Sequence, residues 1–204
     1  MLVRLYDTNT NPRDVRKVAE VLDKGGVIIY PTDSVYAFGC KINAVAGVDK
    51  IARLADKDEN MLTLICSSIS QAAEYARIDN AQFRIIKRNT PGPFTFILNA
   101  SGSISDRVLA KRKTIGIRIP DSPIAQAIIE EVGTPLYTTS VKDPDNITEY
   151  TTDPDLIWER YSDKVDVVVS ANYGNVEPTT IVEDRKSTRL NSSHNVISRM
   201  PSSA

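Results

Sequence analysis

Residues 114–141, TIGIRIPDSPIAQAIIEEVGTPLYTTSV, contain a predicted strand, a helix and a second strand in succession. Residues 114–120 end at a proline and are typical of a strand. Residues 123–133 are typical of a helix, with Gly133 as its C-terminal cap, and residues 135–141 return to a strand pattern. Because a helix between two strands favours a sheet with helices on its faces, this stretch predicts an α/β fold.

The same alternation continues on both sides of this stretch. In residues 13–24, Val15, Val18, Ala19 and Leu22 follow helical spacing, and Gly25 and Gly26 end the helix. With no internal repeat and no interdomain linker, we expect a single α/β domain with a mixed, partly parallel sheet. Further strands are predicted within 25–33, 61–66, 94–100 and 165–171, and further helices at 47–55, 70–78, 81–89, 105–110 and 156–163.

The composition excludes several kinds of chemistry. The chain has 204 residues with 25 Lys or Arg and 26 Asp or Glu, and 41% of its residues are hydrophobic, as in a soluble globular protein. Its one histidine, His194, lies near the C-terminus, so residues 1–184 hold no Ser-His-Asp or Cys-His triad and no histidine-ligated metal. Cys40 and Cys66 are far apart and stand beside apolar residues, which predicts buried thiols. No apolar run approaches the ~18 residues of a membrane span, and no signal peptide is present, so we expect a cytoplasmic protein.

Residues 185–204, RKSTRLNSSHNVISRMPSSA, differ from the rest of the chain. They hold four basic residues, six serines and no acid, without helical or strand periodicity. A disordered tail or a basic nucleic-acid arm has this composition. Since RKSTRLNSSH also resembles translated sequencing-adaptor read-through, we interpret the tail as an artefact and residues 1–184 as the domain, truncated near Asp184. Without the tail, 21 basic residues face 26 acidic ones, so the domain is mildly acidic.

Two turn-like stretches follow or precede predicted strands and carry polar groups. Residues 30–36, YPTDSVY, gather four hydroxyl side chains and one carboxylate where a strand enters a loop, a common place for ligand groups. An ordinary turn explains the same residues equally well. In residues 90–95, TPGPFT, a glycine between two prolines makes a rigid bend that either lets a ligand approach the backbone or only joins a helix to a strand.

Arg118 interrupts an apolar strand just before a proline. An arginine in such a place needs an anionic partner, which is either an internal carboxylate or the carboxylate or phosphate of a substrate. The cations of residues 111–113 are those of a solvated surface. Thr138, Thr139 and Ser140 form a row of hydroxyls that could face a phosphate, but neither a Walker P-loop nor a GxGxxG motif is present.

Taken together, YPTDSVYAFG, TPGPFTFIL, TIGIRIPDSP, PLYTTS and PTTIVE resemble, in order, the motifs of the YrdC/YciO family. The family patterns are YPTDTVYGLG, WPGPLTLIL, TVGVRxP, P-L-x-x-x-S-A-N and PSTIVD. The resemblance runs from about Leu22 to Glu183. GCKI after the first motif and KRKTIGIRIP favour the YciO branch.

Membership of this family implies a twisted mixed sheet with flanking helices and a concave, positively charged cleft. The activity it implies is L-threonylcarbamoyladenylate synthesis, in which threonine and bicarbonate give a carbamate that attacks the α-phosphate of ATP. The product serves N6-threonylcarbamoylation of adenosine 37 in tRNA. This chemistry needs no protein nucleophile, only positioning and cations on the triphosphate, usually with Mg²⁺, and so suits a domain without histidine.

The resemblance also assigns roles to residues. Ser34 stands where the family contacts substrate threonine, flanked by Thr32 and Tyr36, and Arg118 stands where the family clamps the threonine carboxylate. Thr138 matches a position near threonine. The matches to positions that contact ATP are Lys57, Thr114 and Ser140.

Some positions depart from the synthase pattern. Ala55 replaces the lysine of the K-x-R motif, Lys57 takes the arginine position, and Lys142 replaces the asparagine of S-x-N. Losing one cation removes a charge-assisted contact of about 1.5–3 kcal/mol, so we expect the fold and pocket to be kept and synthase activity to be weak, altered or absent. A double-stranded RNA- or tRNA-binding module without synthase activity is the alternative, with Lys111, Arg112, Lys113 and Lys142 as phosphate contacts. Binding of another nucleotide by a protein that has lost catalysis is a third hypothesis.

Overall fold

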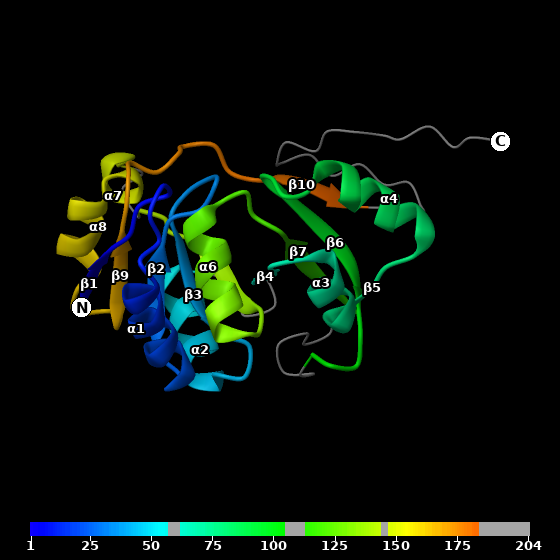
Figure 1. Ribbon diagram of the computed structural model, residues 1–204, viewed down its shortest axis with the longest axis horizontal. Helices are drawn as coiled ribbons and strands as arrows, with labels where there is room; N and C mark the ends of the chain where they lie inside the picture. The colour runs from blue at the N-terminus through cyan, green and yellow to red at the C-terminus, as the bar shows by residue number, and fades with distance from the viewer. Residues whose placement is uncertain (57–61, 105–112, 144–146, 184–204) are drawn as a thin grey trace.

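The computed structural model describes residues 1–56, 62–104, 113–143 and 147–183, and these form one mixed sheet with helices on both faces (Figure 1). The predicted α/β class is therefore confirmed. The strands are β1 (Leu2–Arg4), β2 (Val27–Tyr30), β3 (Ala37–Lys41), β4 (Thr63–Ile65), β5 (Ala76–Arg77), β6 (Phe94–Ala100), β7 (Thr114–Arg118), β8 (Leu136–Ser140), β9 (Val167–Ser170) and β10 (Thr180–Glu183). The helices are α1 (Pro12–Asp23), α2 (Val45–Leu54), α3 (Ile69–Tyr75), α4 (Asn80–Asn89), α6 (Pro123–Val132), α7 (Glu149–Thr152) and α8 (Pro154–Tyr161).

The sheet has the strand order β1-β9-β2-β3-β8-β4-β7-β6-β10, with β5 paired to β6. The pairs β1–β9, β2–β9, β4–β7 and β6–β10 are parallel, and the others are antiparallel. Several neighbouring strands are therefore far apart in the chain, such as β1 and β9 or β6 and β10, so that segments near the two ends of the chain belong to the same sheet. No helix of the described residues is long and apolar enough to cross a membrane.

Local sequence signals set the helix ends. Ser122 caps α6 by accepting a hydrogen bond from the Ala125 amide, and Gly133 ends it with a left-handed φ of 72°. Asp79 and Gln82 form a capping box at the start of α4. The predicted helix at 70–78 ends earlier, at Tyr75, because Ala76 and Arg77 pair with β6 instead. The predicted helix at 105–110 lies outside the described residues.

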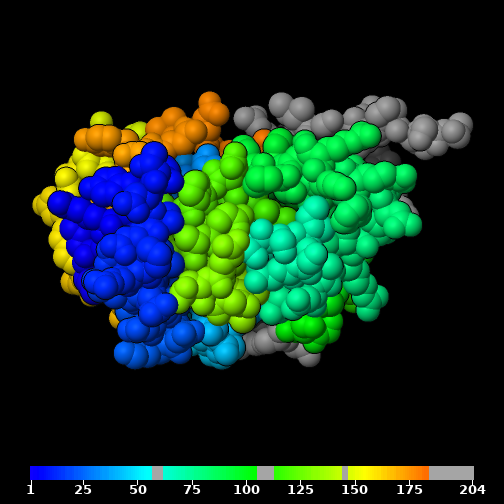
Figure 2. Space-filling model, in the orientation of Figure 1, coloured from blue at the N-terminus to red at the C-terminus, as the bar shows by residue number. Residues whose placement is uncertain are grey.

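Two apolar cores lie on the two faces of the sheet. One core joins α1 and α6 to residues of β2, β8 and β9, and Figure 2 shows these two helices side by side on one face. The other core lies on the opposite face and includes side chains of α2, α4 and α8. Alternation along the strands separates the two cores, since neighbouring residues such as Tyr137 and Leu136 enter different ones.

Gly39 of β3 lies on the face of the sheet that carries the core of α1 and α6. Ile28 and Thr138 are its register partners on β2 and β8, and the ring of Tyr30 lies across it, so that a Cβ at this position would come within 2.7 Å of Tyr30 Cε1. The Tyr30 hydroxyl then donates to Thr138 Oγ1 at 3.0 Å. Glycine at residue 39 therefore makes room for the bridge between β2 and β8.

We predict that Gly39→Ala lowers the free energy of unfolding by about 1–3 kcal/mol, because the added methyl group overpacks the Tyr30 ring. Urea denaturation monitored by circular dichroism measures this change. Gly102→Ala is the matched control, since a Cβ there meets nothing within 4 Å, and its effect is expected within about 0.5 kcal/mol. Equal stability of the two variants would contradict the role assigned to Gly39.

Candidate functional site

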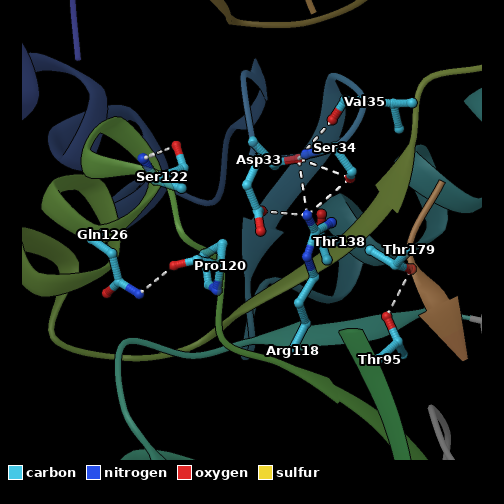
Figure 3. Close-up of polar contacts among 12 residues, drawn as sticks. Asp33, Ser34, Val35, Thr95, Arg118, Pro120, Ser122, Gln126, Thr138 and Thr179 are labelled. Atoms are coloured by element: carbon cyan, nitrogen blue, oxygen red, sulfur yellow. Dashed lines mark hydrogen bonds and ion pairs between the residues drawn. The ribbon is translucent and has the colours of Figure 1, made fainter. Parts of the chain in front are cut away.

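The guanidinium of Arg118 meets the loop that follows β2 (Figure 3). Its Nη2 atom lies 2.9 Å from Ser34 Oγ, 3.2 Å from Thr32 Oγ1 and 2.5 Å from Asp33 Oδ1. Thr32 Oγ1 also accepts from the Ser34 amide at 3.1 Å and donates to the Val35 carbonyl at 2.8 Å. The structure thus brings together Thr32, Ser34 and Arg118, three residues to which the resemblance assigned substrate contacts.

The ion pair between Arg118 and Asp33 is buried. The two side chains are only 7% and 10% exposed. Every hydrogen bond of the guanidinium within the described residues runs from Nη2, while Arg118 Nε and Asp33 Oδ2 are buried without a partner. A buried ion pair is stabilising only when its remaining polar atoms are also satisfied. The site therefore holds an arginine with unused hydrogen-bonding capacity.

A polar face of the sheet extends from Arg118. Thr63 pairs with Thr138 on one side and with Gly116 on the other, so these three residues point to the same face. Ser140 lies two residues after Thr138 on β8, and Thr114 lies two residues before Gly116 on β7. Because β8 is antiparallel and β7 parallel to β4, both residues lie in the same row across that face of the sheet. Among the described residues, α1 and α6 cover this face of the sheet over the strands from β1 to β8. The apolar residues that alternate with Thr63, Gly116 and Thr138 along their strands belong to the core on the opposite face.

Three further side chains make hydrogen bonds beside the site, those of Tyr30, Thr138 and Tyr36. Thr138 Oγ1 accepts from Tyr30 and donates to the Phe38 carbonyl at 2.9 Å, so its hydroxyl is already used twice. Tyr36 is fully buried, and its hydroxyl accepts from the Ala171 amide at 3.2 Å and donates to the Asn172 carbonyl at 3.0 Å. Tyr36 therefore contacts the chain after β9, although the resemblance placed it beside substrate threonine.

Residues 171–179, which we call the crossing segment, connect β9 with β10 across the upper edge of the molecule (Figure 1). The Asn175 amide donates to the Ser34 carbonyl at 3.0 Å, which ties the segment to the Arg118 loop. A Cβ at Gly174 would come within 2.7 Å of the Tyr36 ring. At the far end, Thr179 Oγ1 lies 3.0 Å from Thr95 Oγ1 of β6 (Figure 3). The segment is thus held by both halves of the sheet.

Sequence reasoning did not identify all of these residues. Asp33 was noted as the one carboxylate of its motif, but the internal-carboxylate alternative for Arg118 did not name it as the partner. No local signal singled out Thr95 or Thr179, whose contact depends on the order of β6 and β10 in the sheet. Lys57, Lys111 and Arg112 lie outside the described residues.

The structure shows the surroundings of Ala55 and Lys142, two positions that depart from the synthase pattern. Ala55 is 3% exposed and packs in the core with α2, on the face of the sheet opposite Thr138. A lysine at this position would have to extend out of this core for its ammonium group to reach water or a partner. Lys142 is exposed, and its carbonyl accepts from the Tyr161 hydroxyl at 3.0 Å.

The two cysteines are buried free thiols, as predicted. Burial raises the pKa of each to about 12, so both stay protonated at neutral pH. Among the described residues, no group of three or more His, Cys, Asp or Glu side chains is placed to hold a metal ion. Magnesium is considered below only as part of the MgATP substrate, because Mg²⁺ is usually held by one or two carboxylates together with the substrate phosphates.

Comparisons with known proteins agree with this fold. The family model Sua5/YciO/YrdC, described as "Telomere recombination", matches residues 20–192. The chain therefore belongs to this family. The uncharacterized protein YciO of Escherichia coli K12 is 40% identical over 182 residues, which cover 88% of this chain and 87% of that one. The threonylcarbamoyl-AMP synthase of Vibrio vulnificus is 28% identical over 131 residues, covering 62% and 70%.

Two solved structures share the fold. The crystal structure of E. coli YciO has a TM-score of 0.84 and 38% identity, and the match covers 90% of this chain and 89% of that one. The structure of P. abyssi Sua5 complexed with L-threonine has a TM-score of 0.79 and 20% identity, covering 90% of this chain and 54% of that one. The higher identity to YciO confirms the predicted likeness to that branch.

Burial at this site makes folding sensitive to alkaline pH. It raises the pKa of Tyr30 and of Tyr36 from 10.0 to about 12. A raised pKa means that the folded state holds the phenol proton more tightly than the unfolded state does. The contribution of each phenol to the free energy of unfolding is therefore complete below pH 10 and is lost as the pH rises from 10 towards 12. We predict that the free energy of unfolding falls in this window, by up to about 1.4 kcal/mol per pH unit for each group.

Tyrosinate absorbance at 295 nm, followed together with near-UV circular dichroism, measures this effect. The signals of Tyr30 and Tyr36 should appear only as the fold is lost, and Tyr30→Phe should remove one of them. Titration of all eight tyrosines near pH 10 in a chain that keeps its near-UV spectrum would contradict the burial of these phenols.

Proposed function

We propose that this protein binds MgATP and L-threonine on the polar face beside Arg118 and is of the threonylcarbamoyl-AMP synthase type. The observation that carries the proposal is the buried guanidinium of Arg118, which uses only Nη2 within the described residues. An arginine with unused donors binds carboxylates well, because its fork matches their two oxygens. The V. vulnificus synthase and the threonine-bound Sua5 structure among the relatives support this choice of substrate.

In this proposal each group of residues has one task. Arg118 binds the threonine carboxylate, and Ser34 and Thr32 orient it, with Thr138 supporting them from below. Thr114 and Ser140, at one level of the same face, contact the triphosphate, with Lys57 as the cation predicted by the motif. Tyr36 acts indirectly by holding the crossing segment against the loop.

The reaction proposed for this site needs no protein nucleophile. Threonine nitrogen and bicarbonate form a carbamate with loss of water, and a carbamate oxygen then attacks the α-phosphate of ATP. The bond to the β-phosphate breaks, and pyrophosphate leaves with the electron pair. The protein's contribution is to orient the two substrates and to stabilise charge on the phosphates. Because Ala55 removes one cation of the synthase pattern, we expect slower turnover than in family synthases.

A thermal-shift titration of the full chain tests the proposal. ATP, threonine and both together are added with Mg²⁺ and bicarbonate present, because a ligand of the folded state raises stability by RT ln(1 + [L]/Kd). A larger shift with both ligands than with either alone, followed by threonine-dependent pyrophosphate release, supports the synthase. The absence of any shift in a chain that melts cooperatively argues against it.

The variant Arg118→Lys separates charge from geometry. Lysine still neutralises Asp33 but has no two-pronged donor, so we predict at least a roughly tenfold loss of threonine affinity, with a folded chain. Isothermal titration with threonine in the presence of MgATP measures the loss. Arg16→Lys on α1 is the control with the same chemical change. Unchanged affinity in Arg118→Lys would remove this residue from the site.

A second candidate function, binding of duplex RNA or tRNA, is favoured by how charge is distributed. Residues 66–118 hold nine basic and three acidic side chains, a net charge of +6, whereas the rest of residues 1–184 has a net charge of −11. Residues 143–166, which include α7 and α8, alone hold eight acids and two bases. In Figure 1 the described parts of these two regions, which include α4 and α8, lie toward opposite ends of the long axis. A mildly acidic protein thus has one basic end that could bind phosphates.

We predict that a fluorescent 20-base-pair RNA duplex binds through this basic end. Neutralising Arg84, Lys87 and Arg88 of α4 with glutamine should weaken binding about tenfold and reduce its salt dependence. The same change at Arg13, Arg16 and Lys17 of α1 is the matched control. Equal loss in both triple variants, or binding that disappears at moderate salt, would mean only nonspecific attraction.

A further inference from the structure

A cavity lies away from Arg118, at the end of the sheet where β1 and β9 finish. It has a volume of about 290 Å³ and is lined by residues of β1, β9 and the first turn of α8. The two strands are parallel and end at the same edge, and Arg4 and Ser170 are register partners there. In open α/β sheets ligands bind at the carboxyl ends of parallel strands. In Figure 1, β1, β9 and α8 lie together at the end of the molecule opposite α4.

Ser170 is a polar side chain in this cavity without a partner. It is only 7% exposed and lines the cavity, yet its hydroxyl makes no hydrogen bond with any described residue. Its backbone carbonyl, by contrast, accepts from the Leu5 amide at 3.0 Å. A hydroxyl that makes no hydrogen bond to the described residues is free to donate one to a ligand oxygen in the cavity.

The charges around the cavity have opposite signs and do not neutralise each other. Arg4 comes from β1, whereas Asp153 and Asp155 come from the start of α8. Among the described residues Arg4 forms no ion pair, and Asp153 Oδ1 is occupied as the helix cap, accepting from the Asp155 amide at 2.9 Å. One small ligand that carries both a carboxylate and an ammonium group would pair with both sides.

Two exposed aromatic side chains complete the lining. Tyr6 is 53% and Tyr173 is 76% exposed, which is high for large side chains that line a cavity. Phenol rings provide apolar contact area and attract cations. They favour a ligand with an apolar or aromatic part next to its charged groups.

From these observations we propose that the cavity binds a free α-amino acid with an apolar or aromatic side chain. Its carboxylate pairs with Arg4 and the Ser170 hydroxyl, its ammonium group with Asp155, and its side chain lies against Tyr6 and Tyr173. The site is separate from the Arg118 site, and Tyr36 stands between them, because its hydroxyl bonds Ala171 and Asn172 of the cavity wall. This inference does not rest on the proposed synthase function.

NMR titration of the ¹⁵N-labelled full chain tests the proposal. The probes are L-phenylalanine and L-leucine, together with two analogues that each lack one charge, phenethylamine and 3-phenylpropanoate. We expect at least one amino acid to shift the amides of Asp155 and residues 170–173. Each analogue should bind at least about tenfold more weakly, since a charge-assisted hydrogen bond contributes about 1.5–3 kcal/mol.

Three variants at exposed positions refine the test without disturbing the fold. Arg4→Gln should weaken binding of the amino acid but not of phenethylamine, and Asp155→Asn should do so for the amino acid but not for 3-phenylpropanoate. Arg16→Gln is the control that should change neither. The proposal would be overturned if neither amino acid shifts any amide, or if phenethylamine and 3-phenylpropanoate bind as tightly as the amino acids. Shifts confined to Ser34 and Arg118 would also overturn it.

Discussion

The buried ion pair between Arg118 and Asp33 is the interaction on which the site depends. It joins the end of β7 to the loop after β2, although three strands of the sheet lie between them. Removing one partner of such a pair leaves a buried charge, at a cost of about 3–5 kcal/mol. The loop is therefore fixed in the one position that places Thr32 and Ser34 around the guanidinium. Since Arg118 Nε has no partner among the described residues, the same contact that fixes the loop leaves a donor available for an anionic ligand.

One face of the sheet is polar beside Arg118, although the sheet itself is largely buried. The alternation that puts Leu64, Ile117 and Tyr137 into a core places Thr63, Gly116 and Thr138 on the other face. Apolar side chains there would fill the space and exclude phosphates. The crossing segment then closes the edge of this face, held by Tyr36 at one end and by the hydroxyl pair of Thr95 and Thr179 at the other.

Much of the fold could be predicted from the sequence, because long periodic segments such as α1, α6 and β6 carry strong local signals. β1, β3 and β10 were not predicted: β1 and β10 are short edge strands, and the β3 residues AFGCK lack the alternation of a half-buried strand. The need of Arg118 for an anion was also readable from its place in an apolar strand. The sequence left open whether that anion is an internal carboxylate or part of a substrate, and it did not single out Asp33, since this contact depends on the loop after β2 reaching β7 across the sheet. The hydrogen bonds of Tyr36 to the crossing segment depend on residues 135 and 136 positions away, so no local pattern could reveal them.

The central claim is that Arg118 binds the carboxylate of an amino-acid substrate on the polar face. A crystal structure of the full chain with L-threonine and MgATP tests this most directly. The account predicts the threonine carboxylate within hydrogen-bonding distance of the Arg118 guanidinium, with Ser34 and Thr32 beside it and the phosphates near Thr114 and Ser140. Threonine bound elsewhere, with Arg118 still paired only to Asp33, Thr32 and Ser34, would contradict it.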